Sequence, residues 1–183
     1  MHYSVYVFIP SDGDIEEHVA RALRLYSDEH EVPPYKEYLD VGEIAAMAKH
    51  YGVRRTDRKV LVSHMENWKG NPGGVDQKGI FSIKTFNPKA KWDWYEIGGR
   101  WCQRFPGHVI ATAALLEKKN LKEILPAAMV TPNGWWHEWE TFIVEGWMKW
   151  RTERKKANSW LREVKAALKA HPDMRVVCVD IHR

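Results

Sequence analysis

The sequence predicts an α+β fold in which an antiparallel or mixed sheet is covered by helices. Segments rich in aromatic and β-branched residues stand near both ends of the chain, at 2–9 and 175–181, and we expect them as strands inside the sheet. Amphipathic helix patterns lie between them, an order typical of α+β proteins. A ferredoxin-like arrangement, with the first and last strands central, is one version that this order allows.

Length and composition indicate a single domain over residues 1–183. A chain of 183 residues with 44% hydrophobic and 28% charged residues is long enough to bury its own core. The apolar segment after Met1 lacks the features of a secretory signal, and no stretch approaches the roughly 18 apolar residues of a membrane span. We therefore expect a cytoplasmic protein that does not contact a membrane.

Cysteine spacing and charge limit the possible partners. Cys102 and Cys178 lie far apart without metal-ligand spacing, so we expect free thiols. No metalloenzyme motif occurs either, and the sequence predicts no metal and no cofactor. The net charge of +4 permits a polyanionic partner, and the densest basic run is 149–156. Such a run predicts either a nucleic-acid contact or a solvated helix face.

The first half of the chain carries clear helix start and stop patterns. A capping-box spacing at residues 14–17 predicts a helix that runs to about residue 27. Tandem prolines within 28–40 exclude a helix there and favour an extended path. A second cap opens a helix over 40–52, which ends at a glycine, and a third helix is predicted over 57–69.

The second half alternates strand and helix patterns. Residues 80–86 alternate apolar and polar side chains, as in a half-buried strand. We expect a helix near 111–124, and a strand, turn and return segment over 127–139. The clearest helix pattern is 157–169, where apolar residues recur every three or four positions and bury one stripe.

The segment KWDWYEIGGRW (91–101) is the densest aromatic motif in the chain. Its adjacent glycines, Gly98 and Gly99, allow a sharp turn and close approach of the backbone to a ligand. Arg100 follows at once, and its planar guanidinium can hold a carboxylate or phosphate through two hydrogen bonds. The motif therefore predicts either an unusual corner of the core or a binding site.

Two hypotheses account for these residues. In the structural one, Asp93 or Glu96 neutralises Arg100, the tryptophans are core residues and the glycines make a turn. In the functional one, Arg100 contacts an anion, Asp93 selects polar groups, and planar walls are supplied by Trp92, Trp94, Tyr95 and Trp101. A protein-binding surface would use the same residue types.

Other candidate residues lie outside the motif. Asp180 and His182 leave the same face of the expected last strand, where they form either an acid–base pair or a frayed polar end. His137, in WWHEWE, would be a near neighbour of Glu140 if this segment were helical. Tyr35 and Tyr38 would complete an aromatic cage if the extended segment 28–40 crossed the motif.

The segment NPKAKWDWYEIGGRW (87–101) resembles a family of small uncharacterised proteins from tailed bacteriophages and some bacterial genomes. Looser similarity extends to residues 26–38, 73–88, 130–138 and 179–182. This resemblance implies a phage or prophage origin, and hence location in the host cytoplasm. It carries over no activity and no catalytic residue.

We therefore expect a phage-encoded, non-enzymatic binding protein that sequesters a nucleotide-like ligand or inhibits a host component, such as one of its defences. One alternative is an enzyme acting on a nucleotide or nucleic-acid phosphate, with Asp180, His182 or His137 as the catalytic groups. The other is a basic nucleic-acid-binding protein that uses residues 149–156. The sequence does not indicate an oligomeric state.

Overall fold

The computed structural model describes residues 1–144 and 150–183, apart from the side chains of residues 102, 104, 142–144, 150 and 151. Contacts divide the chain into two compact units, each of which is described by itself. Unit 1 comprises residues 1–30, 87–141 and 153–183, and unit 2 comprises residues 31–86 and 142–152. This division of contacts does not decide whether the two units unfold together as one domain. The expectation of a single domain therefore stays a prediction.

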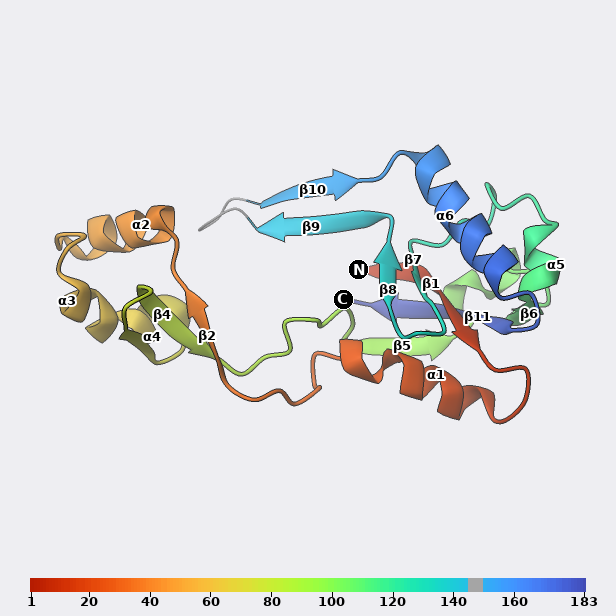
Figure 1. Ribbon diagram of the computed structural model, residues 1–183, viewed down its shortest axis with the longest axis horizontal. Helices are drawn as coiled ribbons and strands as arrows, with labels where there is room; N and C mark the ends of the chain where they lie inside the picture. The colour runs from red at the N-terminus through yellow and green to blue at the C-terminus, as the bar shows by residue number, and fades with distance from the viewer. Residues whose placement is uncertain (145–149) are drawn as a thin grey trace. The chain divides into compact units, whose positions relative to one another are not determined.

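Unit 1 is built on a mixed sheet of six strands (Figure 1). The strands are β1 (His2–Ile9), β5 (Trp94–Ile97), β6 (Ile110–Thr112), β7 (Ala128–Val130), β8 (Trp136–Glu138) and β11 (Arg175–His182). Their order is β5-β11-β1-β7-β8, with β6 also paired to β11. β1 is antiparallel to β11 and parallel to β7, so both terminal strands lie inside the sheet, as predicted.

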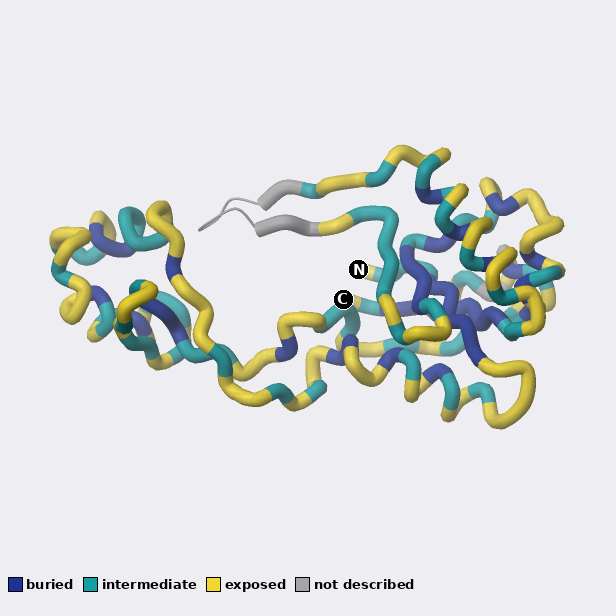
Figure 2. Tube along the Cα trace, in the orientation of Figure 1, coloured by how far each residue is buried: buried dark blue, intermediate teal, exposed yellow. Residues whose placement is uncertain are grey.

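Each face of this sheet carries its own core, because successive side chains of a strand point to opposite faces. On one face Val5, Val7 and Val179 pack against α1 (Ile15–Leu23) and the 3₁₀ turn η1 (Arg24–Tyr26). On the other face Tyr6 and Cys178 pack against α5 (Ala113–Glu117) and α6 (Ala157–Ala170). Figure 2 shows that the buried positions concentrate along β1 and β11.

The helices of unit 1 follow from local sequence. The side chain of Asp14 accepts a hydrogen bond from the Glu17 amide and so caps the start of α1. α6 buries one stripe of side chains, Trp160, Val164 and Leu168, as the three-and-four spacing predicts. A further 3₁₀ segment, η2 (Gly99–Arg104), follows β5.

Unit 2 holds a small antiparallel sheet and three helices. Its strands, in the order β2-β4-β3, are β2 (Tyr35–Tyr38), β4 (Ile80–Lys84) and β3 (Gly73–Val75). The helices are α2 (Val41–Tyr51), α3 (Arg58–Ser63) and α4 (Met65–Lys69). α2 begins with the predicted capping box between Asp40 and Glu43 and ends at Gly52 in the left-handed conformation. Met47, Leu61 and Met65 form the centre of its core.

A two-stranded sheet joins β9 (Glu140–Val144) to β10 (Trp150–Arg154). Arg154 forms an ion pair with Glu140 at 2.7 Å, and its guanidinium lies over the Trp139 ring. The division between the two units passes through these strands.

Three element predictions need correction. The helix expected over 57–69 is divided at His64, where α3 ends and α4 begins (φ −95°, ψ 0°), and the His64 ring stacks on Tyr51. The helix expected near 111–124 is reduced to α5, because residues 110–112 pair with β11 and a turn begins after Glu117. His137 lies on a strand, so it is not a helical neighbour of Glu140.

The α+β class is thus confirmed, with helices packed on mixed sheets. The ferredoxin-like version is not confirmed. Among the helices that the structure describes, none has the length and apolar character that a membrane crossing requires.

Candidate functional site

A polar group of side chains gathers around Asp180, near one end of the central strands of unit 1. Cross-strand pairing sets Ser4 opposite Asp180 and His2 opposite His182, and β5 adds Trp94 beside His182. Residues directly opposite one another in a sheet project from the same face. These side chains therefore project from the face that carries Tyr6 and Cys178. We call His2, Asp93, Trp94, Arg100, Trp101, Asp180 and His182 the Asp180 cluster.

The Asp180 carboxylate is buried, with 2% of its surface exposed, and it accepts four hydrogen bonds. Its Oδ2 accepts from the Arg100 backbone amide at 3.3 Å and from Arg100 Nε at 3.1 Å. Its Oδ1 lies 3.1 Å from both Trp101 Nε1 and His2 Nδ1. A buried charge is tolerated only when it is paired and hydrogen-bonded, and both conditions hold here. The expected frayed polar terminus is therefore not what the structure shows at Asp180.

The Gly98-Gly99 turn places Arg100 and Trp101 over this carboxylate. Both glycines have positive φ, 81° and 50°, which side-chain-bearing residues rarely adopt. The Gly98 amide donates to the carbonyl of Cys178 at 2.7 Å, which holds the turn against β11. The turn was predicted, as the structural hypothesis has it, and the Arg100 amide that follows it donates to Asp180. Whether Gly98 and Gly99 approach a ligand stays a prediction.

Arg100 is fixed at one end and open at the other. Asp180, and neither Asp93 nor Glu96, forms its ion pair, which corrects the partner expected from sequence proximity. The side chain is still 58% exposed. Because the Nε–H is used by Asp180, the two terminal nitrogens of the guanidinium remain as donors that can meet an anion from solvent.

Two imidazoles lie side by side in the Asp180 cluster. His182 Nδ1 lies 2.7 Å from Asp93 Oδ1, and His2 Nδ1 lies near Asp180, so each ring is oriented by a carboxylate. The ring centroids of His2 and His182 are 4.9 Å apart. The hydrogen bond from His182 holds the pKa of Asp93 below its usual value. Trp94 completes the group, with its ring edge toward His2 and 48% of its surface exposed.

The other aromatic residues of the motif are packing residues. Trp92 donates its Nε1–H to the Leu23 carbonyl at 3.0 Å and meets Tyr95 edge-on at 5.0 Å. Both rings pack on the α1 face of the sheet, opposite to the Asp180 cluster. The expected walls therefore separate into two groups, and Trp94 and Trp101 are the ones on the Asp180 side of the sheet.

Tyr35 and Tyr38 belong to unit 2, so the aromatic cage that would join them to the motif stays a prediction. Within unit 2, Asp76 Oδ2 accepts from the Tyr38 hydroxyl at 2.9 Å and from Lys36 Nζ at 2.7 Å. These bonds lower the pKa of Asp76 to about 2, with the Lys36 bond as the largest cause. The Tyr35 ring lies edge-on to Phe86.

The remaining candidates lie elsewhere. His137 stands on β8 with its Nε2 3.5 Å from the Thr131 hydroxyl. Of the basic run 149–156, Lys149 lies outside the described residues, as do the side chains of Trp150 and Arg151. Lys155 forms an ion pair with Glu163 at 2.6 Å, and Arg154 pairs within its own sheet, so these two cations already have acidic partners. Within the described part of the chain, no three His, Cys, Asp or Glu side chains are grouped to hold a metal ion.

His2 is the member of the cluster that sequence reasoning missed. The signal that points to it is the pairing of the first and last strands, which were both expected inside the sheet but not as partners. The register of that pairing was not predictable, and a slip by one residue would move His2 to the other face.

Comparisons with known proteins add no assignment to this geometry. No family model matches the chain, and neither a curated protein nor a solved structure is similar to it.

Proposed function

We propose that the Asp180 cluster binds a small anionic molecule of the nucleotide type. The observation that carries this proposal is Arg100, whose guanidinium is anchored by a buried carboxylate while more than half of the side chain faces solvent. An anchored guanidinium is a prepared phosphate contact, because little of its conformational freedom is lost on binding.

The neighbours of Arg100 support the same proposal. His2 and His182 can each carry a proton and donate a hydrogen bond to phosphate oxygens. Their orientation is already fixed by Asp180 and Asp93. The exposed ring of Trp94 offers a flat apolar surface beside them, against which the sugar of such a ligand can lie.

The direct test is a calorimetric titration with nucleoside monophosphates and with inorganic phosphate. Arg100→Gln should lose at least tenfold in affinity for both, while it still unfolds in one cooperative thermal transition. Arg54→Gln is the matched control, because Arg54 is an exposed arginine that pairs with Asp57 in unit 2. Equal binding by the parent and Arg100→Gln would exclude the site.

We further propose that binding serves to sequester a host nucleotide-like molecule or to block a host component. This rests on the resemblance of residues 87–101 to bacteriophage proteins. A sequestering protein should carry its ligand through purification from bacterial cells, and mass spectrometry of the heat-released small molecules would identify it. If the parent and Arg100→Gln release the same small molecules, sequestration is excluded.

A second candidate is turnover of a phosphodiester, favoured by the two carboxylate-oriented imidazoles. A neutral imidazole would take a proton from water as the water oxygen bonds to phosphorus. The protonated second imidazole would give its proton to the leaving oxygen as that P–O bond breaks, so atoms and charge balance. Incubation with 2′,3′-cyclic nucleotides tests this second candidate. Product formed by the parent but by neither His2→Gln nor His182→Gln supports turnover. If the parent forms no product, turnover is excluded.

A further inference from the structure

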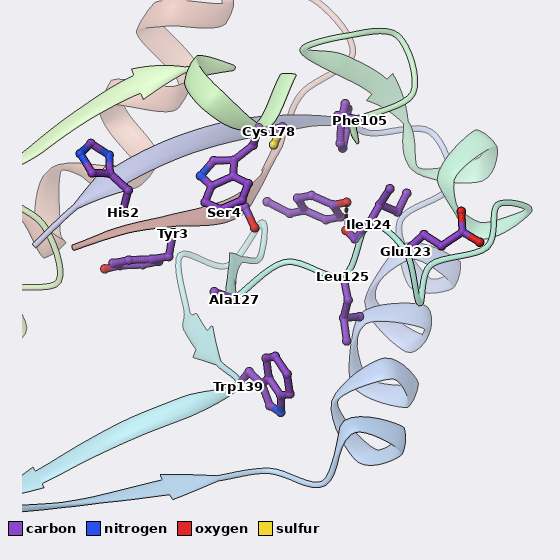
Figure 3. Close-up of a pocket in the computed structure, with 12 residues that line it drawn as sticks. His2, Tyr3, Ser4, Phe105, Glu123, Ile124, Leu125, Ala127, Trp139 and Cys178 are labelled. Carbon is purple, nitrogen blue, oxygen red and sulfur yellow. Dashed lines mark hydrogen bonds between the residues drawn. The ribbon is translucent and has the colours of Figure 1, made fainter. Parts of the chain in front are cut away.

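A cavity of about 200 Å³ lies on the Asp180 side of the unit 1 sheet. Figure 3 shows Ser4 and Cys178 at its sheet side, with Leu125 and Trp139 across from them. Its wall is largely aromatic and aliphatic, including Tyr6, Trp101, Phe105, Ile124, Leu125 and Trp139. Polar groups enter from His2, Ser4 and Glu123.

The size of this cavity suits one planar ring system. An apolar cavity of about 150 Å³ is known to hold a benzene molecule, and a water molecule takes about 30 Å³ of liquid. A cavity of about 200 Å³ therefore admits a ring of one or two cycles, whereas whole small-molecule ligands occupy pockets of roughly 300–1,000 Å³. The sugar and phosphate of a nucleotide would have to remain outside it.

One carboxylate connects the cavity to the proposed anion contact. Trp101 and His2, which both line the cavity, lie against Oδ1 of Asp180. Arg100 Nε donates to Oδ2 of the same group. The wall of the cavity and the guanidinium thus contact the two oxygens of the same carboxylate.

We propose that this cavity receives the base of a nucleoside phosphate whose phosphate contacts Arg100. The base lies against Trp101 and Trp139, while the ribose passes His2 at the edge of the cavity. The Ser4 hydroxyl both donates and accepts, so it meets a polar edge of the ring, which a purely apolar ring lacks. This proposal rests on the proposed function and specifies the ligand of that same site.

A variant that fills the cavity tests the ring contact without changing the anion contact. Ala127 lines the cavity, so Ala127→Leu places three further carbon atoms in or near it. Ala166→Leu is the matched control, because Ala166 is exposed on α6. The probes are the four ribonucleoside monophosphates, the four nucleosides and inorganic phosphate, each titrated by calorimetry.

We expect the parent to bind at least one monophosphate tenfold or more tightly than inorganic phosphate. Ala127→Leu should bind that monophosphate at most about twice as tightly as inorganic phosphate. Its affinity for inorganic phosphate should equal that of the parent. Ala166→Leu should bind as the parent does. A monophosphate that binds Ala127→Leu as tightly as the parent would overturn the cavity proposal and leave the Arg100 contact standing.

The failure of each proposal has a different signature. If Ala127→Leu loses nucleosides and monophosphates while Arg100→Gln binds monophosphates like the parent, the cavity holds the ring and the anion contact is wrong. If no monophosphate binds more tightly than inorganic phosphate, the cavity proposal is wrong. Leu125→Trp adds bulk at another lining residue and repeats the test if thermal unfolding shows that Ala127→Leu does not fold.

Discussion

Gly99 lies directly against Asp180. A Cβ built on Gly99 would come within 2.5 Å of the Asp180 Cβ and 2.9 Å of its Oδ2, closer than carbon atoms approach in folded proteins. The backbone of Gly99 also has a φ of 50°. The absence of a side chain at this position is therefore what lets η2 rest on the buried carboxylate.

Gly99→Ala should destabilise unit 1 by about 2–4 kcal/mol, through strain at positive φ together with the clash. Gly134→Ala is the control, because Gly134 has a φ of 77° and nothing within 4 Å of its added Cβ. It should cost only about 1 kcal/mol. Denaturant unfolding of the two variants measures the difference, and equal losses would show that Asp180 can move aside.

Removing the charge of Asp180 should cost more than removing that of Arg100. Asp180→Asn turns an acceptor of four hydrogen bonds into a group whose amide faces donors, and we expect a loss of about 2–4 kcal/mol. Arg100→Gln should cost less, about 1–2 kcal/mol, because most of that side chain is exposed but its loss leaves the buried Asp180 carboxylate without a paired charge. The ranking of the two unfolding free energies is the measurement, and the reverse order would contradict it.

The two tryptophans of the WDW sequence should behave differently. Trp92→Ala removes a packed ring and a hydrogen bond to Leu23, so we expect a loss of about 3–5 kcal/mol. Trp94→Ala should change stability by less than about 1 kcal/mol, because half of the ring is exposed. Thermal unfolding and nucleotide titration of both variants should show that Trp94→Ala lowers affinity without unfolding the protein.

Asp76 should be a site of acid sensitivity in unit 2. Its pKa of about 2 lies below the ordinary value of 3.8, so its ionised form stabilises the fold above pH 3.8. That contribution is lost as the pH falls toward 2. Carboxyl NMR titration should give a pKa near 2 in the parent and a value closer to 3.8 in Lys36→Met, whereas an unchanged value in the variant would show that Lys36 is not the main cause.

The sequence predicted the parts of this fold that depend on local chemistry. The capping residues Asp14 and Asp40, the stop at Gly52 and the buried stripe of α6 follow from neighbouring positions in the chain. The break at His64 was missed because helical periodicity continues through it. Local pattern does not report a contact such as the Tyr51 ring, which comes from another helix.

The sequence predicted most residues of the candidate site, but not which of them form ion pairs and hydrogen bonds with one another. Arg100, Asp180 and His182 were all identified from sequence, yet the expected partner of Arg100 was an acid in its own motif. The observed partner lies 80 positions away, and strand register decides that pairing. The division of Trp92 from Trp94 depends on the same register, since Trp92 precedes β5 and Trp94 begins it.

The pairing of β1 with β11 also has a consequence for how the protein folds. Contacts between residues so distant in sequence close a very long loop, and such contacts slow folding. On a ribosome β1 would emerge long before β11 and would wait for it with an apolar strand edge unpaired. Residues 31–86, whose strands pair among themselves, have no such delay. Unit 2 should therefore gain structure first, and the Asp180 cluster should be among the last features to form.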